Sequence, residues 1–287
     1  MLLVTGVSGA LGSLVAERLA GRDDVVLGTR AGLPGTRLVD FDDPSTLPDA
    51  FAGIDTLLLI SAGYGEDDVV VARHEAAISA AERAGVGHIV YTSLSGDGDH
   101  LTYALAHRWT ERRLKRSGSS TNWTILRNGL YAELLTWIAS PDADHRITGP
   151  LGDGTIAVVA RADLADVAVS VATDPAPHAG RVYELVGERP LGGADLAAAL
   201  GATYAPTTLA EARTAIAASG AQAFQVPMLA STYSAIAHGF LDGSGVAKSD
   251  LRELLGGREP RDPLEVFVAA VRESAGESVR EQSVREG

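Results

Sequence analysis

The sequence predicts an α/β protein with a doubly wound parallel sheet and a smaller C-terminal α/β lobe. From Met1 to about Asn128, short runs rich in leucine and β-branched residues alternate with longer alanine-rich segments, the pattern of successive βαβ units. Small apolar residues dominate the composition and aromatic residues make up only 5%, which is typical of parallel sheets covered by closely packed helices. Hydrophobic residues account for 46% of the 287 residues, enough for a core in one large domain or in two smaller ones.

The first part of the chain is predicted to hold five or six strands with helices between them. The strands are Leu2–Thr5, Val25–Thr29, Thr36–Asp40, Thr56–Ser61, His88–Thr92 and Trp123–Arg127. The helices are Ala10–Ala20, Ser45–Phe51, Asp67–Ala84 and Leu101–Arg116. Right-handed crossovers would place the C-terminal ends of all these strands at one edge of the sheet, where ligands bind in open parallel sheets.

The alternation loosens after about residue 130, which predicts a second, smaller lobe. We assign residues 1–130 to the first domain, to which some later segments return, residues 131–274 to the second lobe, and residues 275–287 to a disordered tail with little to bury. The second lobe is predicted to contain a strand at Val182–Val186 and helices at Ala221–His238 and Leu264–Val271. The apolar residues of these helices are spaced as core faces.

The first strand leads directly into a glycine-rich turn and then into a helix. Gly6 can form the tight turn, Gly9 lets a pyrophosphate approach the backbone, and Gly12 lets the helix lie close to the sheet. The free amides at the helix N-terminus would then face the phosphates. Glycines also occur in turns that bind nothing, but this position in the first βαβ unit predicts a Rossmann-type dinucleotide site. Its expected contacts are Gly6, Val7, Ser8, Gly9, Ala10, Leu11 and Gly12.

The residue after the second strand indicates which dinucleotide is bound. This strand ends in Arg30, whereas NAD-binding sites place an Asp or Glu there to hold the ribose 2′-hydroxyl. An arginine can pair with a 2′-phosphate through charge-assisted hydrogen bonds, each worth about 1.5 to 3 kcal/mol. The sequence therefore predicts NADPH as the cofactor. In the alternative interpretation, Arg30 is a solvated side chain that neutralises Asp40 or Asp42.

Six segments follow the glycine-rich turn in a recognisable order: Leu57–Ser61, Tyr91–Leu94, Leu126–Tyr131, Gly152–Gly154, Arg161–Asp163 and Val182–Leu185. In order and spacing they resemble the NmrA-like atypical short-chain dehydrogenases and their type 2 NADPH:quinone oxidoreductases. The GxxGxxG spacing of the turn also fits extended and atypical members better than lactate-type dehydrogenases. The resemblance covers most of the chain to about residue 190 and becomes weaker beyond it.

The resemblance implies further cofactor contacts at the C-terminal ends of the strands. The third strand would border the adenine, the loop after the fourth strand would lie along the cofactor, and residues 128–133 would close over the nicotinamide half. The implied residues are Asp40, Phe41, Leu58, Leu59, Ile60, Ser61, Ala62, Thr92, Ser93, Asn128, Gly129, Leu130 and Glu133, with Tyr131 at the acceptor. Alternatively, Asp40 and Phe41 simply end a strand, Asn128 and Gly129 form an ordinary turn, and Ser93 caps a helix instead of orienting a carbonyl.

The chain lacks the Tyr-x-x-x-Lys pair with which ordinary short-chain dehydrogenases exchange a proton. Its only lysines, Lys115 and Lys248, do not follow a tyrosine by four residues. Tyr103 lies four residues before His107, which matches a histidine of the resembling quinone reductases. We therefore take His107 as a candidate catalytic residue that transfers a proton, although it could instead bind the nicotinamide ribose or cap a helix.

Composition excludes several other classes of function. A net charge of −13 argues against a nucleic-acid partner, which requires clustered Lys and Arg. The chain has no cysteine, and its seven histidines show no metal-ligand spacing, so we expect no metal site. Apolar runs are too short for a membrane span, and strand-like sequence begins at Met1, so we expect a cytoplasmic protein without a signal peptide. Asp97 and Asp99 mark an expected loop near the ligand edge.

These observations favour an NADPH-dependent oxidoreductase that transfers hydride to a quinone or a similar small acceptor. The acceptor would lie near Tyr131 and the helices after Ala221, no flavin is implied, and a homodimer is left open. A second interpretation is a non-catalytic NADP(H) sensor of the NmrA type, because the tyrosine–lysine pair is missing. A third is a reductase or epimerase for another small carbonyl compound, which would differ only in the second lobe.

Overall fold

The computed structural model describes residues 1–96, 100–116 and 121–285, so the loop at Asp97 and Asp99 lies outside the described residues. The chain divides into two compact units. Unit 1 comprises residues 1–128, 162–185 and 248–258, and unit 2 comprises residues 129–161, 186–247 and 259–287. The first division follows Asn128, close to the boundary predicted at residue 130, and two later segments of the chain belong to unit 1.

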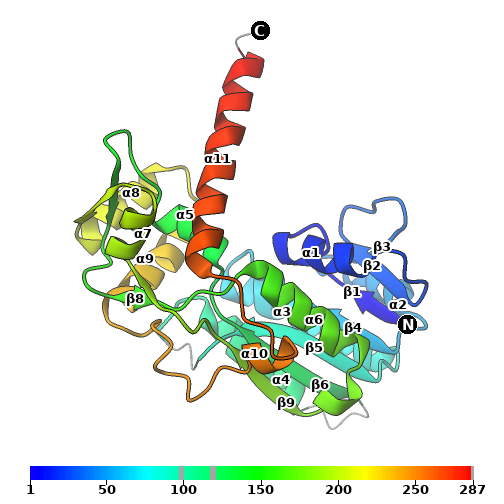
Figure 1. The fold of residues 1–287 in the computed structure, drawn as a ribbon. Helices are drawn as coiled ribbons and strands as arrows, with labels where there is room; N and C mark the ends of the chain where they lie inside the picture. The colour runs from blue at the N-terminus through cyan, green and yellow to red at the C-terminus, as the bar shows by residue number, and fades with distance from the viewer. Residues whose placement is uncertain (97–99, 117–120, 286–287) are drawn as a thin grey trace. The chain divides into compact units, whose positions relative to one another are not determined.

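Unit 1 is built on a seven-stranded sheet. Its strands are β1 (Leu2–Val4), β2 (Val25–Thr29), β3 (Thr36–Leu38), β4 (Thr56–Leu59), β5 (His88–Leu94), β6 (Asn122–Asn128) and β9 (Arg181–Leu185). They are ordered β3-β2-β1-β4-β5-β6-β9, and every neighbouring pair is parallel (Figure 1). The direction of winding reverses between β1 and β4, which confirms the doubly wound, Rossmann-type sheet. In such sheets ligands bind at the carboxyl ends of the two strands where the order reverses.

The helices of unit 1 have sequences that suit their ends and their packing. They are α1 (Ala10–Arg18), α2 (Leu47–Phe51), α3 (Asp67–Arg83), α4 (Ala104–Lys115), α6 (Arg161–Thr173) and α10 (Leu251–Leu254), with 3-10 turns η1 (Pro44–Thr46) and η3 (Ala176–His178). Helix α3 begins with Asp67 and Asp68 and ends with Arg83, so its charges oppose the helix dipole. It packs against α2 and α4.

The strands at the centre of the sheet are apolar on both faces because helices cover both. The side chains of Leu57, Leu58 and Leu59 in β4 are fully buried, as is Tyr91 in β5. Phe51 from α2 belongs to one core cluster with Leu57, Leu59 and Tyr91. This pattern of continuous apolar strands is what parallel sheets require.

One strand lies elsewhere than the sequence suggested. The strand predicted at Val182–Val186 was grouped with the second lobe, but β9 pairs with β6 and extends the sheet of unit 1. The local pattern correctly indicates a strand, whereas its pairing with β6 is a long-range contact that no local pattern encodes.

Unit 2 contains two small sheets and several helices. The strands are β7 (Arg146–Gly149) paired in parallel with β11 (Thr203–Pro206), and β8 (Thr155–Ile156) paired antiparallel with β10 (Leu191–Gly192). The helices are α5 (Leu135–Ile138), α7 (Gly193–Ala199), α8 (Leu209–Ala218), α9 (Gln225–Ala237) and α11 (Pro263–Arg285), with the 3-10 turn η2 (Ala132–Leu134). Ile147, Leu196, Ile236 and Phe267 are fully buried in the core of unit 2.

Helix α11 continues through residues that the sequence analysis assigned to a disordered tail. It runs to Arg285, as the long terminal helix in Figure 1 shows. The glutamate, arginine and glutamine that recur in this part of the sequence are good helix formers. Within the described residues, none of the helices combines the length and the apolar character needed to cross a membrane.

Candidate cofactor site and its polar network

The glycine-rich turn between β1 and α1 has a separate physical reason for each glycine. Gly6 has a φ of +70°, a left-handed conformation that favours glycine. The amide of Gly9 donates a 3.0 Å hydrogen bond to the carbonyl of Gly6, which closes the turn. A Cβ on Gly12 would lie 2.1 Å from the carbonyl oxygen of Gly6, so no larger residue fits where α1 meets the turn.

The same turn exposes the groups that a pyrophosphate needs. Val7, Leu11 and Gly12 are buried, while Gly6, Ser8, Gly9 and Ala10 are exposed. The first turn of α1 carries no acidic residue, so its free amides and the positive end of its dipole are not opposed. The turn therefore fits a dinucleotide pyrophosphate.

Arg30 follows β2 and is largely exposed, with 69% of its side chain accessible. Its Nη1 lies 3.5 Å from Oδ2 of Asp42, so the pairing considered in the sequence analysis exists, but such an exposed pair contributes little energy. Asp42 is held more firmly by Arg73 of α3, whose Nε and Nη2 donate to its two oxygens at 2.7 and 2.8 Å. The hydrogen bond from Arg73 lowers the pKa of Asp42. Sequence reasoning missed Arg73, because only the fold brings α3 beside the end of β3.

Asp40 and Phe41 form the turn after β3. The amide of Asp40 donates to Oγ1 of Thr46 at 3.1 Å, and its Oδ1 accepts from the amide of Asp42 at 2.9 Å. Phe41 is half-buried and packs against the core of unit 1. Both residues thus have structural roles that leave part of each side chain accessible beside Arg30 and Asp42.

The loop after β4 could meet a ligand mainly through its backbone. The side chains of Leu58 and Leu59 lie entirely in the core, and the carbonyl of Leu58 accepts from the amide of Thr5 at 3.1 Å. Ile60 lies beside the glycine turn, since a Cβ on Gly6 would lie 3.6 Å from the Cβ of Ile60. This contact places the loop directly next to the expected pyrophosphate site.

Two buried side chains fix the backbone of the same loop. The amide of Ser61 donates to Oγ1 of Thr92 at 2.9 Å, and the amide of Ala62 donates to Nε2 of His74 at 3.0 Å. Because Nε2 accepts, Nδ1 of His74 carries the hydrogen and donates to Oγ1 of Thr110 at 2.8 Å. Burial lowers the pKa of His74 to about 3, so the imidazole is neutral. Thr92 was expected at the cofactor, whereas no sequence pattern pointed to His74.

His107, the candidate catalytic residue, is hydrogen-bonded to a tyrosine of the central sheet. Its Nδ1 lies 2.8 Å from the hydroxyl of Tyr91, which is fully buried in β5. Burial lowers the pKa of His107 to about 4 and raises the pKa of Tyr91 above its usual value. The phenol is therefore the donor and the imidazole the acceptor, which leaves a hydrogen on Nε2 of His107. Tyr103, which the sequence places on the same face, forms the N-cap of α4.

Ser93 belongs to a buried ionic network instead of an exposed strand tip. Its hydroxyl donates to Oε1 of Glu111 at 2.7 Å, and Arg127 donates to both oxygens of Glu111 at 2.9 and 2.7 Å. Burial raises the pKa of Glu111, but hydrogen bonds from Arg127 and Ser93 and the nearby Arg108 outweigh it, so the pKa is lowered overall. Only 2% of Glu111 is exposed. The hydrogen of the Ser93 hydroxyl is thus donated to Glu111.

Asn128 ends β6 with an unused acceptor. The residue is 5% exposed, and its Oδ1 is buried without a hydrogen-bond partner among the described residues. An unsatisfied buried acceptor costs about 1 to 3 kcal/mol unless a ligand provides a donor. The amide group of a nicotinamide or a ribose hydroxyl would provide one, so this atom fits a dinucleotide at the carboxyl edge of the sheet.

The residues that follow Asn128 belong to unit 2. The carbonyl of Leu130, the residue after the buried Gly129, accepts from the amide of Val159 at 2.9 Å. The guanidinium of Arg161 lies over the ring of Tyr131, 5.1 Å from its centroid. Both carboxylate oxygens of Glu133 accept from the amide of Arg161 at 3.2 Å, which caps the start of α6. Glu133 therefore has a structural role, and Tyr131 is held by a cation–π contact.

The described part of the chain offers no set of ligands for a metal ion. No group of three or more His, Asp or Glu side chains is arranged there to hold an ion. The features that fit a bound group are the glycine turn, the fixed loop after β4 and the unused acceptor of Asn128, and all three fit a dinucleotide.

Known proteins include a matching family and relatives of this chain. A family described as NAD(P)H-binding matches residues 6–175. The chain is 36% identical to quinone oxidoreductase 2 of Escherichia coli over 202 residues, 66% of this chain and 69% of that protein. It is also 30% identical to an NmrA-like family domain-containing oxidoreductase of Aspergillus flavus over 185 residues, 57% of this chain and 58% of that protein.

A solved structure extends the similarity to nearly the whole chain. The crystal structure of the NADPH-dependent quinone oxidoreductase of Escherichia coli in complex with NADPH superposes with a TM-score of 0.79. It covers 94% of this chain and 99% of its own, at 31% sequence identity. This protein therefore belongs to the NAD(P)H-binding family and, within it, to the NmrA-like oxidoreductases that include the type 2 quinone oxidoreductases.

Proposed function

We propose that this protein is an NADPH-dependent reductase that transfers hydride to a quinone or a similar small acceptor. The observation that carries the proposal is that the glycine turn after β1 and the unused acceptor of Asn128 at the end of β6 occupy the same carboxyl edge of one parallel sheet. A pyrophosphate on the turn and a nicotinamide or its ribose near Asn128 would use both.

NADPH, rather than NADH, is supported by the charges at the end of β2. No carboxylate follows this strand directly, and the exposed Arg30 is only weakly paired with Asp42. Because Arg73 already neutralises Asp42, Arg30 can turn to a 2′-phosphate with little loss of energy. We therefore assign Arg30 as the residue that selects NADPH.

The two side chains that we expect near the nicotinamide, Tyr91 and His107, are uncharged at neutral pH. The hydroxyl of Tyr91 donates its hydrogen to Nδ1 of His107. Bound NADPH would supply a hydride, and a quinone that accepts this hydride together with one solvent proton becomes a hydroquinone. Such an acceptor needs little acid catalysis from the protein, which suits a site without the tyrosine–lysine pair. His107 would then orient the ribose or the acceptor through its Nε2 hydrogen.

The acceptor class is proposed from the relatives. The Escherichia coli protein, which is 36% identical over 202 residues, is named for quinone oxidoreduction. Tyr131, fixed by Arg161 in unit 2, is the side chain that we propose to contact the acceptor.

The proposal is tested by following the loss of NADPH absorbance with a panel of benzoquinones and naphthoquinones and without acceptor. We expect quinone-dependent oxidation that is faster with NADPH than with NADH. Asn128→Ala should weaken NADPH binding by about tenfold, since one hydrogen bond in a buried site is lost. The control is Asn122→Ala, because Asn122 is exposed at the opposite end of the same strand. Equal NADPH affinity in both variants would remove Asn128 from the site.

The neutral, buried Tyr91–His107 pair also favours a second candidate function, that of a sensor of the NADPH to NADP⁺ ratio. A sensor needs the cofactor site but no proton donor. Tight binding of NADPH without oxidation by any acceptor of the panel would support the sensor and contradict the reductase.

A further inference from the structure

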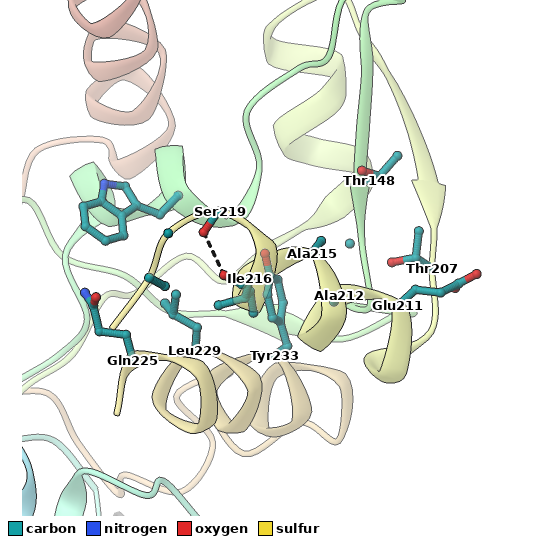
Figure 2. Close-up of a pocket in the computed structure, with 14 residues that line it drawn as sticks. Thr148, Thr207, Glu211, Ala212, Ala215, Ile216, Ser219, Gln225, Leu229 and Tyr233 are labelled. Carbon is teal, nitrogen blue, oxygen red and sulfur yellow. Dashed lines mark hydrogen bonds between the residues drawn. The ribbon is translucent and has the colours of Figure 1, made fainter. Parts of the chain in front are cut away.

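A pocket of about 600 Å³ lies within unit 2 between α8, α9 and the paired strands β7 and β11. Figure 2 shows it with the fourteen residues that line it. None of these residues belongs to the cofactor contacts described above. The volume is in the range of small-molecule sites, which are typically about 300 to 1,000 Å³.

The middle of the pocket is apolar because small side chains face larger ones. Ala212 and Ala215 on α8 lie opposite Leu229 and Tyr233 on α9 (Figure 2). The hydroxyl of Tyr233 donates to the carbonyl of Ile138 at 3.3 Å, so the ring, rather than the hydroxyl, is available to a ligand. The two alanines leave a slot that suits a flat, apolar body.

One end of the pocket carries a negative charge. Glu211 lies there with Thr148 and Thr207 (Figure 2). Its Oε2 accepts from the amide and from the hydroxyl of Thr208 at 2.8 and 2.7 Å, which fixes the carboxylate at the start of α8. The hydrogen bond from the Thr208 backbone lowers the pKa of Glu211, so the group is ionised at neutral pH.

The lining offers no positive charge to balance Glu211. The fourteen lining residues include no Lys, Arg or His, and Arg213, two residues further along α8, is not among them. Trp137 of α5 lines the pocket and is 65% exposed, although an exposed tryptophan is unfavourable in water. Its indole can therefore stack on the flat ring system of a bound ligand.

We propose that this pocket of unit 2 binds a planar aromatic cation, with the ring system between α8 and α9 and the positive charge toward Glu211. The site does not depend on the cofactor site, since all of its residues belong to unit 2. It requires no turnover, so it can be tested separately from the proposed reductase activity.

The test is isothermal titration calorimetry of the full chain without cofactor, using three anthracenes that do not accept hydride. The probes are (9-anthracenylmethyl)trimethylammonium, 9-anthracenemethanol and anthracene-9-carboxylate, which share one ring system and differ in charge. We expect the cation to bind most tightly and the carboxylate most weakly. A carboxylate that binds as tightly as the cation would overturn the proposal.

Three variants locate the binding. Glu211→Gln keeps a side chain that can complete the capping box with Thr208, and should weaken the cation about threefold to fivefold while leaving the alcohol unchanged. Trp137→Ala should weaken all three probes to a similar degree, because the indole would stack on the ring system that they share, and Trp137→Phe should restore part of the loss. Ala215→Phe should abolish binding of all probes by filling the slot. Its control is Ala210→Phe, since Ala210 is exposed on the same helix and does not line the pocket. Unchanged cation affinity in Ala215→Phe would place any binding elsewhere and contradict the assignment.

Discussion

The hydroxyl of Tyr91 on β5 donates a 2.8 Å hydrogen bond to Nδ1 of His107 on α4, and this bond links the centre of the sheet to the candidate catalytic residue. The two rings are 6.1 Å apart. Tyr91 also contacts His74 edge to face, with ring centroids 5.4 Å apart. His74 in turn fixes the loop after β4 through Ala62, so one buried group of side chains connects the loop to the candidate proton-holding residue.

Tyr91→Phe should slow NADPH oxidation because Nδ1 of His107 loses the donor that sets its tautomer and orientation. The same change should lower the free energy of unfolding by about 1 to 2 kcal/mol, since it leaves a buried acceptor without a partner. Steady-state kinetics and urea unfolding measure the two effects. Tyr183→Phe is the matched control, because the hydroxyl of Tyr183 makes a 2.8 Å hydrogen bond to Nδ1 of His178 within unit 1. It should lose similar stability and keep its rate; a similar loss of rate would show that Tyr91 has no special role.

Acid should destabilise the protein through its buried histidines. Burial lowers the pKa of His74 to about 3 in the folded chain, from about 6.5 in the unfolded chain. The unfolded chain therefore binds the extra proton first, so the stability contributed by neutral His74 is complete above about pH 6.5 and falls as the pH drops toward 3. The limiting slope is about 1.4 kcal/mol per pH unit for one such group.

The contribution of His74 can be isolated with His74→Gln. The amide oxygen of glutamine can still accept from the Ala62 amide but does not titrate. Urea unfolding is measured between about pH 4.5 and 7, the range in which the unfolded histidine gains its proton. As the pH falls, the free energy of unfolding should decrease less steeply in the variant than in the parent chain. Parallel pH profiles for the two proteins would mean that His74 is protonated in the folded state.

Arg30→Ala should weaken NADPH by about tenfold or more and leave NADH unchanged, because only NADPH offers a 2′-phosphate. Dissociation constants for both dinucleotides, measured by the change in their fluorescence on binding, test this. Arg22→Ala is the control, since Arg22 is also exposed but pairs with Asp24 just before β2, at the strand end away from Arg30. An equal loss for NADH and NADPH in Arg30→Ala would contradict the assignment.

Two glycine variants separate packing from ligand approach. Gly12→Ala should lower the free energy of unfolding by about 3 kcal/mol, because its methyl group would meet the backbone of Gly6 at 2.1 Å. Gly9→Ala meets the same carbonyl at 3.3 Å in an ordinary backbone conformation, so it should fold nearly normally and lose mainly NADPH affinity. Thermal unfolding and NADPH titration on both variants are the measurements. Similar stability of the two proteins would be inconsistent with the close contact at Gly12.

The sequence alone determined the features that depend on local spacing. Alternating apolar and alanine-rich segments predicted every strand of the first domain within a few residues, for example Val25–Thr29 as observed for β2. The position of the glycines between a strand and a helix predicted the turn at Gly6, because only glycine readily takes its left-handed φ. The position of Arg30 directly after β2 was predicted in the same way, because it depends only on where that strand ends.

Only the tertiary structure decided which side chains meet. His74 and Thr110 are 36 residues apart, and Arg127 and Glu184 are 57 apart, so no local pattern links either pair. Tyr103 was the tyrosine that spacing associated with His107, whereas strand β5 presents Tyr91 to it. The strand at Val182 was visible, but its place beside β6 was not. Secondary structure is encoded by nearest neighbours along the chain, while these partners are set by the order and register of parallel strands, which long-range packing selects.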